Sequence, residues 1–237
     1  MSAELSATAT VEEILSKKSV IELRELARSF YVKGSSKMRK VELISEVKAA
    51  LMIPERLEEL LYVLDSAAWQ TFRKAAESSE PVKLNLTESR WYQILHGLCY
   101  LHFITGNRSL SCNVPPEIRT VYDSLVTDGL IQRKKHYDQL HLYAEAAANL
   151  YGVISQDDFV ALFNSQNEDK TSKEELFDAL IRHIVVDAGY CFWDKYIVDI
   201  GFEDNGFADV SDLLAQIGDK PRYIPEKKEF LKYADWR

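Results

Sequence analysis

The sequence predicts a mainly α protein that carries short β-hairpins. Apolar residues recur at helical spacing through most of the 237 residues, and several such stretches open with serine or threonine three residues before an acidic residue. Short segments that alternate apolar and polar residues, such as "VKLNL" at 82–86, indicate strands. Hydrophobic residues make up 46% of the chain and charged residues 28%, which is a globular composition and excludes a disordered or fibrous protein.

The first part of the chain, which we call the head (residues 1–53), is predicted to form three short helices. Capping-box patterns open the first two, Thr10 with Glu13 and Ser19 with Glu22. We expect Gly34 to follow the end of the second helix and Ser36 to cap the third. The face of the third helix is expected to be Met38, Val41, Ile44, Val47 and Leu51, and the small core to contain Leu23, Leu26, Phe30, Val41, Ile44 and Val47.

Residues 54–129 are predicted to be helical with two short strands. Pro54 suits the first turn of a helix, and Asp65 is expected to cap the next one. After the strand at 82–86, Thr87 is expected to cap the helix "ESRWYQILHGLCYLHFI". The alternating "SLSCNV" then predicts a second strand, and "PPEIRTVYDSLVTDG" predicts a helix with proline at its start and glycine after its end.

Residues 130–206 predict a helix stopped by Gly152, the short strand "VIS", and two helices opened by Ser155 and Thr171. Two strands follow around Asp194 and Lys195. This order is that of a winged helix, and residues 54–129 look like a looser version of it. The fold class is therefore mainly α, with a helix-extended-helix head, a helical, winged-helix-like body with short β-hairpins, and a C-terminal helical tail at 207–237.

Composition and motifs narrow the function classes. No apolar run approaches the roughly 18 residues of a membrane span, and the N-terminus lacks the pattern of a signal peptide. The three cysteines are few and widely spaced, which suits a reducing cytoplasm. No phosphate loop, zinc-protease motif, nucleophile elbow or dinucleotide-binding loop is present. We therefore expect a cytoplasmic protein that does not cross a membrane, is not an enzyme and needs no cofactor.

One set of residues suggests metal ligands. His96, Cys99 and His102 are expected on one side of a helix, at spacings of three residues. Three consecutive turns do not converge well on a tetrahedral ion, and a fourth ligand is not obvious beyond Cys112. The better interpretation is a helix interface, with no metal bound.

The charge of the chain is unevenly distributed. Residues 17–48 hold nine Lys or Arg and four acids, a net charge of +5, whereas the whole chain carries −8 and the remainder therefore −13. Four cations, Lys33, Lys37, Arg39 and Lys40, crowd where the third helix should begin, although the helix dipole disfavours cations there. A phosphate bound at that helix N-terminus would offset this cost. The alternative is that the cations are solvated, with Lys33 and Arg39 hydrogen-bonded to the preceding loop.

Residues 15–51 resemble the N-terminal helical domain of transcription termination factor Rho, a relative of SAP and LEM modules. The matching features are Leu15, Ser19 to Leu23, Leu26, Ala27, Gly34, Ser36, the Lys-Met-Arg-Lys at 37–40 and Glu42 to Ile44. The resemblance implies a module that associates with nucleic acid. In Rho an OB-fold beside this module binds the bases, whereas helices follow here, so base recognition and termination activity do not carry over.

The function expected from the sequence is non-catalytic. The head would contact phosphates of RNA or DNA through Lys33, Ser36, Lys37, Arg39 and Lys40, and the acidic body would bind a protein partner or self-associate. A DNA-reading helix should expose Arg, Lys, Asn or Gln. The helix "SKEELFDALIRHIV" instead shows Glu174, Glu175 and Asp178, with Lys173 and Arg182, which favours a scaffold or protein-binding surface. The alternative is an adaptor without nucleic-acid binding, whose acidic body binds a basic partner, even as a nucleic-acid mimic.

Overall fold

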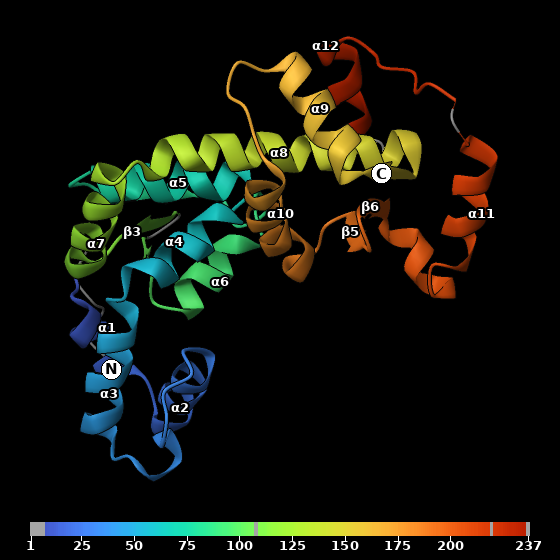
Figure 1. Cartoon of the computed structure of the whole chain (residues 1–237). Helices are drawn as coiled ribbons and strands as arrows, with labels where there is room; N and C mark the ends of the chain where they lie inside the picture. The colour runs from blue at the N-terminus through green and yellow to red at the C-terminus, as the bar shows by residue number, and fades with distance from the viewer. Residues whose placement is uncertain (1–7, 107–108, 219, 236–237) are drawn as a thin grey trace. The chain divides into compact units, whose positions relative to one another are not determined.

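The structure is a computed structural model that describes residues 8–106, 109–218 and 220–235. The chain divides into two compact units, residues 1–130 and 131–237, each of which is described by itself (Figure 1). Helices dominate both, and each contains one three-stranded antiparallel sheet within the described residues. The predicted fold class, mainly α with short β-hairpins, is therefore confirmed. The finer division at residues 53, 129 and 206 stays a prediction.

The first unit begins with the helices of the head. They are α1 (Val11–Lys17), α2 (Val20–Ser29) and α3 (Lys40–Leu51), with a 3₁₀ turn η1 (Ser35–Lys37) before α3. Both predicted capping boxes are present at the starts of α1 and α2. Helices α1 and α2 pack against α3 around Leu15, Leu23, Leu43, Val47 and Leu51, all fully buried. Val41, expected in this core, is 79% exposed, so α3 turns Leu43 inward in its place.

The rest of the first unit surrounds a small sheet. Its elements are α4 (Pro54–Tyr62), α5 (Ser66–Glu77), β1 (Val82–Leu84), α6 (Trp91–Gly97), β2 (His102–Thr105), β3 (Leu110–Asn113) and α7 (Pro116–Thr127). Strand β3 lies between β1 and β2. Asp65 caps α5 as predicted, by accepting a hydrogen bond from the Ala68 N–H at 2.8 Å.

The helix predicted over 88–104 is shorter in the structure at both ends. Helix α6 starts only at Trp91, so Thr87 does not cap it, and residues 102–105 form strand β2 instead. Cys99 ends the helix with a positive φ of 65°, and the Tyr100 N–H then donates back to the Leu95 carbonyl at 2.9 Å. This left-handed cap directs the chain out of the helix and into the sheet.

Hydrogen bonds and ion pairs join the head to the remainder of the first unit. The Val11 N–H donates to Glu117 of α7 at 3.1 Å, and Lys48 pairs with Glu12 and Glu117 at 3.2 and 3.5 Å. On the α4 side, the Arg56 guanidinium donates to the Phe30 carbonyl at 2.6 Å and lies over the Phe30 ring. The head therefore packs as part of the first unit.

The second unit repeats the strand order of the first. Its elements are α8 (Leu130–Tyr151), β4 (Val153–Ser155), α9 (Gln156–Gln166), α10 (Lys173–Val186), β5 (Tyr190–Trp193), β6 (Tyr196–Asp199), η2 (Ile200–Asn205), α11 (Ala208–Ile217), α12 (Lys227–Phe230) and η3 (Leu231–Asp235). Strand β6 lies between β4 and β5, as β3 lies between β1 and β2. Gly152 ends α8 with φ of 70°, and Ser155 caps α9, both as predicted.

Each face of the second sheet packs against different helices. Tyr190 and Ile197 join the main core with α8, α9 and α10, which also buries Phe230 of α12. On the opposite face, Val153, Cys191 and Val198 pack with Val210 of α11. The predicted cap at Thr171 is wrong by one residue, because Ser172 accepts the Glu175 N–H at the start of α10.

Candidate nucleic-acid interface

The candidate interface is the connection between α2 and α3, which we call the basic loop (residues 32–40). Helix α2 ends when Tyr31 takes a positive φ of 54°. The Val32 N–H donates to the Ala27 carbonyl at 2.7 Å, and the Tyr31 N–H donates to Arg28 at 3.0 Å. These are the paired bonds of a Schellman motif, so Tyr31 occupies the position predicted for Gly34. Gly34 lies three residues further on, with φ of 75°, where it opens η1.

Helix α3 starts later than predicted. Arg39 is its N-cap residue, and the extended Met38 separates it from η1. Ser36 is exposed in the 3₁₀ turn and does not cap α3, so that expectation is wrong. The carboxylate of Glu42 accepts the Arg39 N–H at 2.6 Å instead. Because Glu42 already places negative charge at this helix end, any phosphate contact would depend mainly on side chains of the loop.

Three of the predicted cations extend into solvent from the basic loop. Lys33, Lys37 and Arg39 are exposed, and in the described part of the chain their side chains form no hydrogen bond or ion pair. The alternative in which Lys33 and Arg39 bond to the preceding loop is therefore not what the structure shows. These cations can contact a phosphate without first breaking a hydrogen bond or ion pair within the described part of the protein.

Lys40 is placed differently from the other three cations. It is half-buried, and its Nζ donates to the Ser16 carbonyl in the last turn of α1 at 2.8 Å. A lysine bonded to a carbonyl near a helix C-terminus stabilises that helix end. Lys40 thus holds α1 against the start of α3, and the structure separates it from the free cations of the basic loop.

An exposed aromatic residue borders the basic loop, and the sequence analysis missed it. The Tyr31 side chain is 87% exposed, and Ile21 and Val41 of the adjoining helices are 68% and 79% exposed. An exposed ring beside free cations is the combination that stacks on unpaired bases while the cations contact phosphates. The sequence signal was an aromatic residue at the edge of a basic cluster, in "SFYVKG".

The three residues that were weighed as metal ligands and assigned to a helix interface do not lie on one helix. His96 is in α6 and stacks on Phe103 at a centroid distance of 4.0 Å, Cys99 forms the left-handed cap, and His102 begins β2. Burial raises the pKa of the Cys99 thiol to about 11 and lowers the pKa of both histidines. Within the residues that the structure describes, no group of three His, Cys, Asp or Glu side chains is arranged to hold a metal ion.

The surface of α10 differs sharply from that of the basic loop. Glu174 and Asp178 are exposed, and the half-exposed Phe177 stacks on Phe192 of β5 at 5.3 Å. Residues 131–237 hold 13 Lys or Arg and 20 Asp or Glu, a net charge of −7. This helix therefore combines carboxylates with an aromatic contact surface.

Comparison with known families identifies the segment that carries the basic loop. Residues 15–55 match the family described as Rho termination factor, N-terminal domain. This match confirms the resemblance of the head to that domain, over less than a fifth of the chain. No curated protein and no solved structure matches the chain. Among the described helices, none is both long enough and apolar enough to cross a membrane.

Proposed function

We propose that this is a non-catalytic, nucleic-acid-associated protein whose head contacts the phosphates of RNA or DNA. The observation that carries the proposal is the set of three exposed, unpaired cations, Lys33, Lys37 and Arg39, on one short loop. That loop lies inside the segment that matches the Rho N-terminal domain. Ser36 adds an exposed hydroxyl in the same turn, and Lys40 contributes by fixing the loop against α1.

The chemistry of the loop predicts weak binding with little sequence preference. Phosphate contacts orient a nucleic acid without reading its bases. With about three contacts, we expect an affinity in the micromolar range or weaker at physiological salt. Stacking on Tyr31 would favour single strands over duplexes, because only unpaired bases present a free face.

The second unit supports a separate role in protein binding. We infer that it is a winged-helix-like domain, from its helix, strand, helix, helix, strand, strand order and the central position of β6. In DNA-binding members of such folds, the helix that precedes the final two strands enters the major groove. In the second unit that helix is α10. Here α10 presents Glu174 and Asp178, which repel phosphates, and Phe177, which suits a protein surface. The acidic unit would thus bind a protein partner or a second copy.

The test is a fluorescence-anisotropy titration of the whole protein with labelled single-stranded RNA, single-stranded DNA and duplex DNA at low and physiological salt. The variant Lys33→Gln/Lys37→Gln/Arg39→Gln should weaken binding to every probe about equally. It should also reduce the slope of log affinity against log salt by about 0.7–0.9 for each lost contact. Folding should be unaffected, because these exposed side chains form no hydrogen bond or ion pair with any residue that the structure describes.

The matched control, Lys74→Gln/Lys83→Gln/Lys228→Gln, removes three exposed cations elsewhere that have no ion-pair partner among the described residues. It lowers the net charge by the same amount, so it should retain most of the affinity if the basic loop is the site. Equal losses in both triple variants would show that only overall charge matters. Absence of any binding at low salt would remove the nucleic-acid role and leave the adaptor, which the acidic and aromatic surface of α10 favours.

A further inference from the structure

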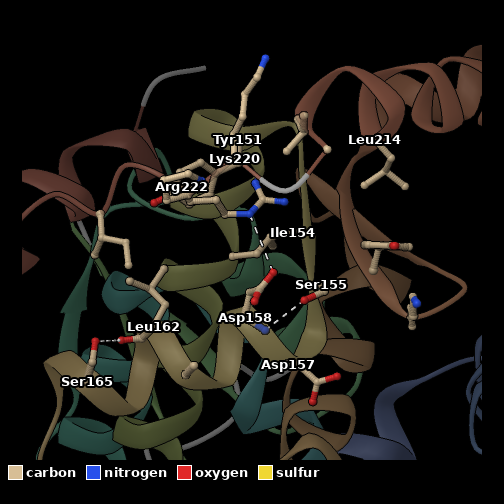
Figure 2. Close-up of a pocket in the computed structure, with 17 residues that line it drawn as sticks. Tyr151, Ile154, Ser155, Asp157, Asp158, Leu162, Ser165, Leu214, Lys220 and Arg222 are labelled. Atoms are coloured by element: carbon tan, nitrogen blue, oxygen red, sulfur yellow. Dashed lines mark hydrogen bonds and ion pairs between the residues drawn. The ribbon is translucent and has the colours of Figure 1, made fainter.

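The second unit contains a pocket that neither the nucleic-acid role nor the protein-binding role uses. It has a volume of about 760 Å³ and lies between α9, α11 and residues 220–224 (Figure 2). A volume of this size is typical of pockets that enclose a small organic ligand. All of its walls belong to the second unit, so its shape depends on this unit alone.

The floor of the pocket is apolar. Ile154 and Leu162 line it from the main core, and both are nearly completely buried. Leu214 and Ile217 line it from α11 and are only half-buried, because the pocket lies between them and α9. A ligand with an apolar body would cover these α11 side chains, at about 25 cal/mol for each Å² of apolar surface removed from water.

A cation with unused donors lines the same pocket. The Arg222 side chain is 19% exposed, and its guanidinium carbon lies 5.3 Å from the centre of the Tyr151 ring. The Tyr151 hydroxyl donates to the Tyr223 carbonyl at 2.7 Å, which fixes the ring on which Arg222 rests. Among the described residues, the only polar contact of Arg222 is to Asp158, at 3.9 Å from Nε, which is too long for a hydrogen bond.

The carboxylates of the pocket are better satisfied than the arginine. Asp157 pairs with Lys173 at 2.6 Å and points away from Arg222 in Figure 2. Asp158 is 60% exposed, so water solvates its charge. Arg222 carries five N–H donors in a fixed fork. Most of its side chain is covered, but none of its nitrogens is among the described polar atoms that are both buried and without a partner, so its free donors face the solvent of the pocket. The charged group of this pocket that is open to a further partner is therefore a cation, and an anion is its complement.

We propose that this pocket binds a small amphiphilic anion. The apolar or aromatic body of the ligand lies between α9 and α11, against Leu214 and Ile217. Its carboxylate, sulfonate or phosphate group accepts hydrogen bonds from the Arg222 guanidinium, whose fork matches two oxygens of such a group. Lys220 lines the pocket from the same segment and Lys195 from the turn between β5 and β6, and both add positive charge.

The probe for the test is 8-anilinonaphthalene-1-sulfonate, which combines an aromatic body with a single sulfonate. Titrated into the whole protein, it should show a saturable, blue-shifted fluorescence increase with one site per chain. Arg222→Gln should weaken binding about tenfold or more, because a charge-assisted hydrogen bond is lost. Asp158→Asn should tighten it severalfold, because the neighbouring negative charge is removed.

Two further variants separate this pocket from other apolar surfaces. Ala161 lies on α9, is exposed and lines the pocket, so Ala161→Phe fills the space without entering the core and should abolish the saturable signal. Lys228→Gln removes a cation of the same unit outside the pocket and should leave the affinity unchanged. Circular dichroism of the parent protein and of each variant checks that all of them are folded. A parent protein without a saturable signal, or a signal that survives both Arg222→Gln and Ala161→Phe, would overturn the proposal.

Discussion

Acidification should destabilise the second unit through a stacked pair of histidines. His141 of α8 and His183 of α10 stack with their ring centres 3.9 Å apart and their planes within 4°. His141 is hydrogen-bonded to the Tyr190 hydroxyl at 2.9 Å, and among the described residues His183 Nε2 has no hydrogen-bond partner. A proton on either ring would place a charge in the core, beside the other ring and near Lys134.

The pKa shifts give the direction and the size of the effect. Burial, with a smaller contribution from Lys134, lowers the pKa of His141 to about 4. Burial, followed by the neighbouring His141, lowers the pKa of His183 to about 3. Between these values and the ordinary pKa of about 6.5, the unfolded chain binds protons that the folded chain does not. Stability is therefore complete above pH 6.5 and falls by about 2 kcal/mol for each histidine between pH 7 and pH 5.

The assay combines urea unfolding at pH 7 and pH 5 with an NMR titration of the imidazole C–H signals. His183→Gln should remove about half of the pH-dependent loss that the stacked pair contributes. Asp138, whose pKa burial raises, acts in the opposite direction, and it cancels when the parent is compared with the variant. The reasoning fails if either ring titrates above pH 6 in the folded protein, or if the variant loses as much stability as the parent.

Three substitutions test the local structure by urea unfolding. Leu26→Ala should cost about 2–5 kcal/mol, because Leu26 is buried in the head, whereas Val41→Ala should cost less than about 0.5 kcal/mol. Comparable losses at both positions would show that the face of α3 is misassigned. Tyr31→Gly should stabilise the head by about 1 kcal/mol, because glycine adopts the left-handed cap without strain; a loss would mean that the exposed ring contributes to packing.

Local chemistry was enough to predict many of the starts of helices and the strands. The caps at Thr10, Ser19, Asp65 and Ser155 follow from side chains that bond to the backbone N–H three residues later. Alternating segments likewise identified β1 and β3, and short extended segments identified β4, β5 and β6. The basic loop was also visible in the sequence, because its cations lie within seven residues of one another.

The ends of two helices were not predictable in the same way. Tyr31 and Cys99 both adopt the left-handed conformation that the sequence would assign to glycine, and both terminate a helix there. An L-residue with a side chain enters this region only where the surrounding structure offsets the strain. At Cys99 the compensation is tertiary, since its side chain is fully buried. This is why strand β2 was mistaken for a continuation of α6.

The sequence by itself determined that this is a helical protein with a Rho-like, basic segment near its start, because periodicity, caps and charge are local properties. The tertiary structure alone decided which cations are free. Lys40 is adjacent to Arg39, yet it bonds to Ser16, 24 residues earlier, while Arg39 extends into solvent. It also decided that Arg222 meets Tyr151 beside an apolar pocket, 71 residues apart in sequence. Contacts at such separations depend on how whole helices pack, and no local pattern in the sequence encodes them.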